Sequence, residues 1–429
     1  MARKIPPRVL LLMTPATYRA SDFLAAAAAA GVEIVVGTSH PQSLAGDVPE
    51  RHLTLPFHDP PLAAAQTRAF AAAHPLTAIM GVDDEGAVVA AAIAAELELP
   101  HAALSAVAAT CDKAEMRRLL QGAAVGSPPF TVCRDRRDLQ RVAREIGFPC
   151  VVKPLFLAAS RGVIRADDPA ALEAALARVE ALLARPDVQE RARIVPPVRH
   201  EGMILVEEFV PGDEVALEGL LEDGVLRVLA LFDKPGRLEG PYFEETLYVI
   251  PSRLPASTQR QIEDCAAKTV EALGLNDGPV HGEFRVNRAG VWVIELAART
   301  MGGLCARVLR FGAGMSLEEI VLRHACGLEI PTFQREAAAA GVMMIPIPRR
   351  GVLRTVHGEA EARKVEGVED VILSIAVGQE VVPLPEGNRY LGFLFARGPD
   401  PAAVEATLRS AHGKLAFSIQ AAPPPGGPT

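Results

Sequence analysis

The first hundred residues alternate between short apolar runs of strand length and longer alanine-rich segments of helical composition. The strands are expected at residues 8–13, 32–37 and 77–82, and the helices at residues 21–30, 62–73 and 84–97. This alternation is typical of a parallel sheet with helices on its faces. The sequence therefore predicts an N-terminal parallel α/β domain over residues 1–111.

The pattern changes from residue 112 on, where short apolar strands follow one another closely and few helices separate them. The strands are expected at residues 149–154, 203–210, 214–221, 226–232, 282–287 and 291–297, and the helices at residues 112–120, 170–184 and 256–273. Such a close succession of strands predicts antiparallel ladders and an α+β arrangement. Residues 185–200 are polar and contain prolines, so an exposed loop is expected there.

A third pattern begins near residue 341. Short strands between Pro and Gly turns, with one late helix at residues 401–412, predict a small C-terminal α+β domain. The last residues, which end in PPPGGPT, have nothing to pack and are expected to form a disordered tail. The expected parts are residues 1–111, 112–340, 341–420 and 421–429.

Composition narrows the class of protein. Of the 429 residues 49% are hydrophobic, which supplies several cores and excludes a disordered chain. The net charge of −8 and the aromatic content of 5% argue against nucleic-acid binding, which needs clustered cations or stacking rings. No apolar run reaches the roughly 20 residues of a membrane span, and the six cysteines lack CxxC spacing, as in reduced cytosolic proteins. We therefore expect a cytoplasmic protein without nucleic-acid or membrane partners.

Two glutamates in otherwise apolar strands carry the sharpest chemical signal. Glu283 lies in HGEFRV and Glu295 in VWVIELAAR, and a hairpin is expected to bring the two strands together. Strict alternation would place Val293 and Glu295 on one face and Ile294 on the other. A carboxylate in such a strand needs a cation, because burying an isolated charge is costly. Two of them suit Mg²⁺, which binds one or two carboxylates together with phosphate oxygens.

A structural alternative exists for both glutamates. Glu283 and Glu295 would then form salt bridges with Arg285 and Arg299. Spacing alone slightly favours this alternative, so the metal site depends on the other signals in the chain.

Lysines beside small residues point to phosphate binding. Lys153 ends the apolar strand CVVKP, and the following loop at residues 157–162 is rich in Ala, Ser and Gly. A lysine charge and the backbone N–H groups of such a loop can hold phosphates. Lys113, near a helix start, is a weaker candidate because most lone lysines simply lie at the surface. Residues 205–214 (LVEEFVPGDE) fit either a solvated hairpin end or a hinge whose backbone binds adenine.

In this order, the motifs resemble the ATP-grasp superfamily. The resemblance covers roughly residues 1–340 and rests on Asp112-Lys113 with Arg117, VVKP, SRGV, EEFVPGDE, HGEF and IELAAR. It implies an ATP-grasp fold: an N-terminal α/β domain followed by two α+β subdomains that clasp ATP between their sheets.

A narrower resemblance is to the bacterial L-amino acid ligases, which join two amino acids into a dipeptide. It rests on FDKP at residues 232–235, on GPYFEET at residues 240–246 and more loosely on residues 351–420. It implies an ATP-dependent carboxylate–amine ligase that forms an amide through an acyl phosphate. One departure is Ala297, which stands where many ATP-grasp enzymes carry an asparagine that binds the metal.

The resemblance also implies a role for each matching residue, with amino acids as small-molecule substrates. Lys113 and Lys153 would hold the phosphates of ATP, Ser160, Arg161 and Gly162 would form the lid, Glu207, Phe209 and Val210 would line the adenine pocket, Glu214 would bind the ribose, and Glu283 and Glu295 would bind Mg²⁺ or Mn²⁺. Arg299 and Lys153 would act in catalysis, and Glu245, Tyr248, Arg299 and Gly303 would contact the substrates.

Several alternatives stay open at this point. A purine-pathway or biotin-carboxylase-like ligase would share the fold, but PYFEET and the lack of a biotin-acceptor region argue against it. A nucleotide-binding sensor or scaffold without ligase activity is supported by Ala297. A dinucleotide-binding oxidoreductase is disfavoured because the first turn, TPATY, lacks glycine. Asp83 is a candidate to face the cleft, with its neighbour Asp84 as a helix cap, and a homodimer is compatible with the sequence.

Overall fold

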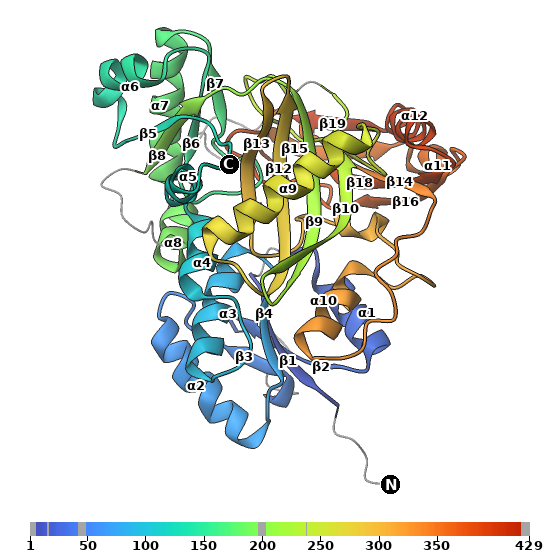
Figure 1. The fold of residues 1–429 in the computed structure, drawn as a ribbon. Coiled ribbons are helices and arrows are strands. Elements are labelled where there is room, and N and C mark those ends of the chain that lie inside the picture. Colours follow the sequence, from blue (N-terminus) through green and yellow to red (C-terminus); the bar gives the residue numbers. More distant parts are fainter. Residues whose placement is uncertain (1–5, 15–16, 42–48, 196–202, 237, 422–429) are drawn as a thin grey trace, which may run out of the picture.

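The N-terminal part is a small parallel sheet with helices around it (Figure 1). The computed structural model describes residues 6–14, 17–41, 49–195, 203–236 and 238–421. The elements here are β1 (Arg8–Leu12), α1 (Ala20–Ala30), β2 (Glu33–Thr38), β3 (His52–Thr54), α2 (Pro60–Ala73), β4 (Ala78–Gly81), α3 (Asp84–Glu96) and α4 (Leu104–Cys111). The strands pair in parallel in the order β3-β2-β1-β4. The predicted parallel α/β arrangement is confirmed.

A four-stranded antiparallel sheet follows, in the order β5-β8-β6-β7. Its elements are α5 (Lys113–Gly122), β5 (Phe130–Cys133), α6 (Leu139–Ile146), β6 (Cys150–Pro154), β7 (Ile164–Ala166), α7 (Pro169–Leu183), α8 (Pro186–Ile194) and β8 (Ile204–Glu208). The exposed loop expected at residues 185–200 is wrong in its first half, which is α8. Pro186 suits the first helical position, and Val188 is fully buried, so packing favours a helix in this polar segment. Residues 196–202 lie outside the described residues.

The central sheet is antiparallel and runs in the order β13-β12-β9-β10-β11-β14-β18-β16. Its strands and the helices beside them are β9 (Asp213–Glu222), β10 (Val225–Asp233), β11 (Leu247–Ile250), α9 (Ala256–Leu273), β12 (Gly278–Asn287), β13 (Gly290–Ala297), α10 (Leu317–Ala325), β14 (Ala339–Ile345), β16 (Val368–Leu373) and β18 (Gly392–Gly398). The C-terminal residues thus extend the central sheet. The proposed boundary between residues 340 and 341 falls within β14.

The remaining C-terminal elements form a small three-stranded sheet and two helices. They are β15 (Gly351–His357), α11 (Glu359–Arg363), β17 (Glu380–Val381), α12 (Pro401–His412) and β19 (Ala416–Gln420). The expectation of one helix in this part is wrong, since α11 is present as well as α12. The sequence did not reveal α11 because its five residues are too few to show a helical period. The proposed tail falls almost wholly on residues 422–429, which lie outside the described residues. No helix among the described residues has both the length and the apolar character needed to cross a membrane.

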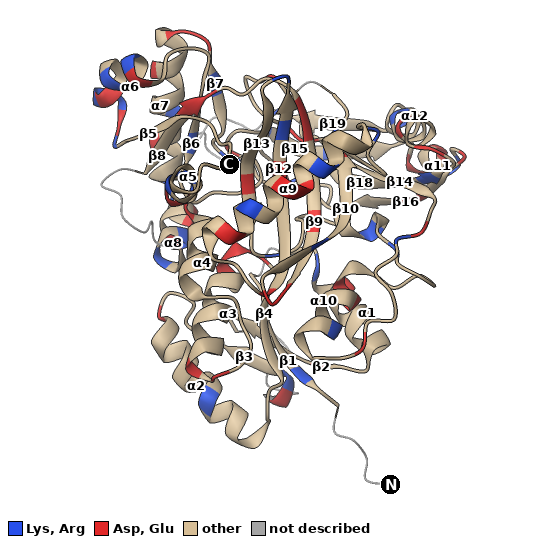
Figure 2. Cartoon of the chain, in the orientation of Figure 1, with Lys and Arg blue, Asp and Glu red and all other residues tan. Residues whose placement is uncertain are grey.

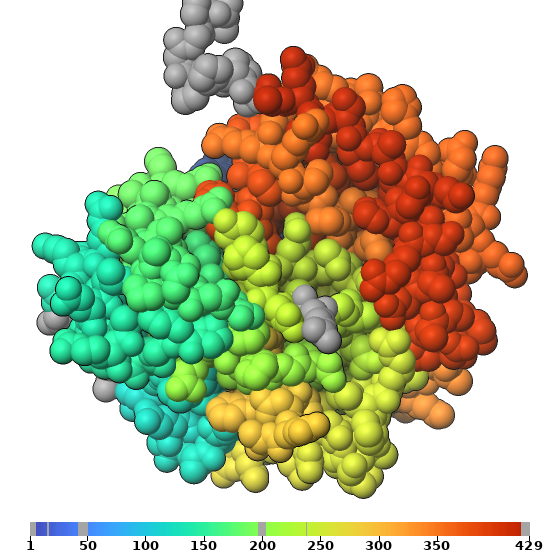
Figure 3. Space-filling view, turned by 90° about the horizontal axis from the view of Figure 1, so that it is seen from above, coloured from blue at the N-terminus to red at the C-terminus, as the bar shows by residue number. Residues whose placement is uncertain are grey.

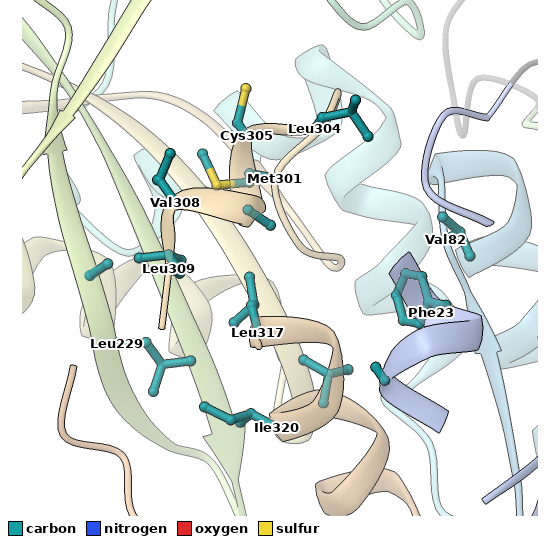
Figure 4. Packing of buried hydrophobic residues seen from close by; sticks show 14 of the residues in the cluster. Phe23, Val82, Leu229, Met301, Leu304, Cys305, Val308, Leu309, Leu317 and Ile320 are labelled. Atoms are coloured by element: carbon teal, nitrogen blue, oxygen red, sulfur yellow. The ribbon is translucent and has the colours of Figure 1, made fainter. Parts of the chain in front are cut away.

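One apolar core joins the N-terminal part to the central sheet. It includes Phe23 of α1, Leu229 of β10, and Leu317 and Ile320 of α10. In Figure 4, Phe23 and Val82 lie on one side of this core and Leu229 on the other, with α10 between them. The parallel sheet and the central sheet therefore pack against the same buried core, which fixes their relative position.

This shared core generates a prediction about stability. Phe23 is 1% exposed, so Phe23→Ala should lower the free energy of unfolding by about 3–5 kcal/mol through lost burial and a residual cavity. Urea titration followed by circular dichroism measures the change. The matched control is Leu24→Ala on the same helix, because Leu24 is 49% exposed and should cost less than about 0.5 kcal/mol. Equal costs for the two variants would contradict the core assignment.

Candidate active site

A cavity of about 190 Å³ lies between the β5-β8-β6-β7 sheet and the central sheet. In Figure 3 the lobe formed by residues 112–195, in teal and green, and the orange-to-red C-terminal part lie on either side of yellow-green residues of the central sheet. All but two of the expected site residues line this cavity. They are Lys113, Lys153, Ser160, Glu207, Phe209, Val210, Glu214, Glu245, Tyr248, Glu283, Glu295, Arg299 and Gly303.

The β12–β13 hairpin brings the two expected metal ligands face to face. Glu283 pairs directly with Glu295 in the antiparallel register, and Figure 2 shows acidic positions on these tan strands. The next pair is Phe284 with Val293, so Ile294 is an extra residue that forms a β-bulge. Val293 consequently packs in the core beside α9, whereas Ile294 and Glu295 both line the cavity. The strict alternation expected for β13 is wrong at this bulge.

Lys113 is a buried cation at the start of α5. It is 5% exposed, so the surface explanation considered for it is wrong. Its Nζ donates to the carbonyl oxygen of Leu157 at 2.6 Å and lies 3.2 Å from Oε1 of Glu295. Lys113 thus connects α5, the loop after β6 and the end of β13. The alternative salt bridges of Glu283 and Glu295 with Arg285 and Arg299 are also wrong, since both glutamates pair with lysines.

Lys234, which follows β10, contacts three carboxylates. Its Nζ lies 2.9 Å from Glu214, 2.7 Å from Glu245 and 2.9 Å from Glu283. Burial alone would lower the pKa of Lys234, but the three acids raise it well above its usual value. The sequence reasoning missed this residue as a site residue. The signal was present, because FDKP repeats the lysine–proline ending of the strand that carries Lys153.

Lys153 takes part in a second buried cluster. Glu207, which is 2% exposed, forms ion pairs with Lys153 and, at 3.0 Å, with Arg117. Burial would raise the pKa of Glu207, and the two cations lower it instead. Arg117 also donates to the carbonyl oxygen of the bulge residue Ile294 at 2.7 Å. Helix α5 is therefore tied to both sheets that enclose the cavity.

Arg299 follows β13 and is held by the N-terminal part of the chain. Its Nε donates to Asp84 at 2.6 Å, and Arg191 of α8 binds the other oxygen of Asp84 at 2.9 Å. Among the described residues, no hydrogen-bond partner is found for its Nη2. The helix cap of α3 is Asp83 rather than Asp84, and neither aspartate lines the cavity. Asp83 also accepts two hydrogen bonds from Thr14 at 2.8 and 2.7 Å.

Aromatic rings line one end of the cavity. Phe209 and Phe243 stack with centroids 6.2 Å apart, and Arg165 lies over Phe209 at 4.2 Å. Arg285 donates to Glu214 at 2.8 Å and to the carbonyl oxygen of Val210 at 2.7 Å. This end can receive a flat ring, with backbone groups of the segment after β8 at its edge.

Glu245 and its neighbours form the other end. Tyr248 donates a hydrogen bond to Glu245, and burial together with Glu283 raises the pKa of Glu245 to about 7. Gly303 has φ of +63°, and a Cβ there would lie 3.1 Å from Phe393, so glycine suits both the backbone and the packing. Further wall residues here are Met301, Cys305, Met344 and Tyr390.

Arg161 and Gly162, expected in the lid, do not line the cavity. Arg161 donates to the carbonyl oxygen of Glu386 at 3.0 Å, and the N–H of Gly162 donates to the carbonyl oxygen of Pro385 at 2.8 Å. Only Ser160 of the three reaches the cavity, with φ of +53°. The loop that was expected to form the lid is thus attached to the C-terminal part, which borders the green lobe in Figure 3.

Three family models match separate parts of the chain. They describe an ATP-grasp N-terminal domain at residues 24–101, an ATP-grasp domain at residues 146–308 and an L-amino acid ligase C-terminal domain 2 at residues 343–420. The crystal structure of L-amino acid ligase from Bacillus licheniformis matches with a TM-score of 0.82 and 26% identity, covering 97% of this chain and 100% of that chain.

Curated relatives match over shorter stretches. Alanine–anticapsin ligase of Bacillus subtilis is 29% identical over 245 residues, which are 54% of this chain and 50% of that protein. D-Alanine–D-alanine ligase of Syntrophotalea carbinolica is 26% identical over 226 residues, which are 51% of this chain and 66% of that protein. The chain therefore matches half to two thirds of the length of these relatives.

The cluster around Lys234 generates a prediction. Lys234→Met should lower the free energy of unfolding by about 3–5 kcal/mol, because it removes a buried cation and leaves three partly buried carboxylates without it. Thermal and urea unfolding measure the change. The matched control is Lys268→Met on the exposed face of α9, which should change stability little. A similar small effect in both variants would show that the carboxylates do not depend on Lys234.

Proposed function

The chain belongs to the ATP-grasp superfamily and carries the C-terminal domain of L-amino acid ligases, and from this premise we propose that it is an ATP-dependent carboxylate–amine ligase that joins amino acids. The observation that carries the proposal is the direct pairing of Glu283 with Glu295 in a cavity that also receives Lys113, Lys153 and Arg299. Two carboxylates among three cations suit a nucleoside triphosphate with a divalent metal and a second, acidic substrate.

ATP would lie along the length of the cavity. Its adenine would occupy the end with Phe209 and Phe243, and its phosphates would meet Lys113 and Lys153. Support for the ribose position comes from Glu214, whose oxygens bind Lys234 and Arg285 and still have lone pairs for hydroxyl groups.

A divalent cation fits the two facing glutamates. All contacts of Glu283 with Lys234, Tyr248 and His281 use Oε1, and Glu295 also uses Oε1 for Lys113. Among the described residues, Oε2 of either glutamate has no partner, and such oxygens are the ligands that Mg²⁺ and Mn²⁺ prefer. Ala297 supplies no further ligand. When bound, the ion would neutralise charge on the β- and γ-phosphates.

The reaction would need positioning and electrostatic stabilisation rather than a protein nucleophile. The carboxylate of one amino acid would attack the γ-phosphorus of ATP and release ADP. The amine of the second would then attack the acyl phosphate and release phosphate. Arg299 would stabilise these species with Nη2, while Asp84 keeps its guanidinium oriented.

The amine substrate would bind near Glu245. The protein already supplies this carboxylate with a cation, Lys234, so a substrate ammonium would share Glu245 with it. Met301, Cys305 and Met344 make this end largely apolar, which favours amino acids with uncharged side chains.

A second candidate, a nucleotide-binding sensor without turnover, is favoured by Ala297 alone. The purine-pathway and biotin-carboxylase-like alternatives are less well supported, since residues 343–420 match a domain of L-amino acid ligases.

The decisive experiment is a screen for ADP release over pairs of amino acids with purified full-length protein. A ligase should release ADP only with particular pairs, and added hydroxylamine should trap the acyl phosphate as a hydroxamate. ATP binding without ADP release for any pair would favour the sensor.

Glu295→Gln should abolish ADP release and leave the fold intact. The amide keeps the volume of the side chain but removes the charge that would hold the metal. Steady-state kinetics at saturating Mg²⁺ measure the effect, with circular dichroism for folding. Glu222→Gln, at the exposed end of β9, is the matched control. Wild-type turnover in Glu295→Gln would refute the metal assignment.

Arg299→Lys should still bind ATP, but its kcat should fall by about 10²-fold or more, on the scale of one lost transition-state donor. Lysine lacks the planar fork that can hold Asp84 and the reacting group together. Arg191→Lys is the matched control, because Arg191 binds the same aspartate without lining the cavity. Equal and small effects of both substitutions would leave Arg299 only the structural role of pairing with Asp84.

A further inference from the structure

A buried acid–base pair that the proposed chemistry does not use lies next to Glu283. Glu218 of β9 is fully buried, and His281 of β12 stands directly opposite it in the antiparallel register. Nδ1 of His281 makes a short contact with Oε1 of Glu218. Nε2 of the same ring lies 3.5 Å from Oε1 of Glu283. The imidazole therefore stands between two carboxylates, one of which is an expected metal ligand.

The surroundings of Glu218 make this arrangement costly to maintain. Its neighbours on the same face of β9, Ala216 and Leu220, belong to the apolar core shared with α1 and α10. A carboxylate in such a core must be compensated, since an unpaired buried charge is strongly destabilising. An apolar pair at these positions would pack the core without that cost, so a role beyond packing is indicated.

The second oxygen of Glu218 holds the segment that follows Arg299. The backbone N–H of Met301 donates to Oε2 of Glu218 at 3.2 Å. Met301 is 1% exposed and, in Figure 4, lies in the core close to Cys305, while Met301 and the glycines at 302 and 303 also line the cavity. One buried carboxylate thus contacts both the histidine beside Glu283 and the wall of the substrate end.

We propose that His281, oriented by Glu218, is a positioning residue that directs the Glu283 carboxylate toward the divalent cation, and that Glu218 couples this carboxylate to the Met301 segment. The inference rests on the proposed function and deepens it. The ring presents one nitrogen to each acid, Nδ1 to Glu218 and Nε2 to Glu283.

Glu218→Met is the most informative variant. The carboxylate of Glu218 contacts both the N–H of Met301 and Nδ1 of His281. Methionine has a similar volume but only a weak acceptor, so both contacts should be lost. The imidazole would then no longer be held beside Glu283, and the orientation of the Glu283 carboxylate should be lost.

The test measures Mn²⁺ binding to the full chain in the presence of saturating ADP, by electron paramagnetic resonance of the free ion. Glu218→Met should weaken Mn²⁺ binding by about 10–100-fold, the range found when a partner of a metal ligand is removed. Binding of ADP in EDTA should change less than about twofold. The matched control is His324→Gln, which removes another histidine–carboxylate pair, with Asp277 at 3.0 Å, outside the cavity and should leave Mn²⁺ affinity unchanged.

A second variant covers the case in which Glu218→Met does not fold. The double change Glu218→Met with His281→Leu removes both ionisable groups, so neither is left buried without its partner and the fold should persist. It should show the same selective loss of Mn²⁺ affinity. Wild-type Mn²⁺ affinity in a folded variant would overturn the positioning role and leave the proposed function intact. A wild-type protein whose ADP complex binds no Mn²⁺ would overturn the cation site and the positioning role together.

Discussion

Charge compensation across element boundaries is the constraint on which the rest of this structure depends. The carboxylates that line the cavity, apart from the exposed Glu208, are buried or half-buried, and each of these has a cation on a different element. Glu295 of β13 pairs with Lys113 of α5, and Glu207 of β8 pairs with Lys153 of β6 and Arg117 of α5. Because separating a buried pair leaves a costly lone charge, these pairs oppose any displacement of the two antiparallel sheets relative to each other.

In the proposed function, the same constraint would prepare the cavity for a polyanion with a metal. Lysines that already face carboxylates can exchange part of that contact for phosphate oxygens without leaving a charge uncompensated. The phosphates would draw lysine charge away from the carboxylates. A divalent cation at Oε2 of Glu283 and Glu295, which has no partner among the described residues, would replace this positive charge. Loading the site would therefore require little rearrangement of charge, which is the property expected of an electrostatically preorganised site.

Structural features that depend on the local residue pattern could be predicted from the sequence. Features that depend on contacts between residues far apart in the chain could not. Apolar alternation and a short turn were enough to predict the hairpin that carries Glu283 and Glu295, but not their direct pairing, which depends on the bulge between them. The bulge at Ile294 could not be predicted, because it is stabilised by Arg117, which lies 177 residues away. Helix α8 was missed for the same reason, since its polar residues are held by distant acids rather than by an amphipathic period. Most site residues were found through the order of motifs, whereas Lys234 required knowledge of which strand ends meet.

The C-terminal part completes the site. The hydrogen bonds of Arg161 and Gly162 to the backbone of Glu386 and Pro385 attach the loop around Ser160 to this part, and Tyr390 lines the cavity. Strands from this part also extend the sheet that carries Glu283. The C-terminal part is therefore connected to this loop by hydrogen bonds and to Glu283 through the sheet. In the proposed function, ATP along the cavity and the amine near Glu245 would both depend on the position of this part.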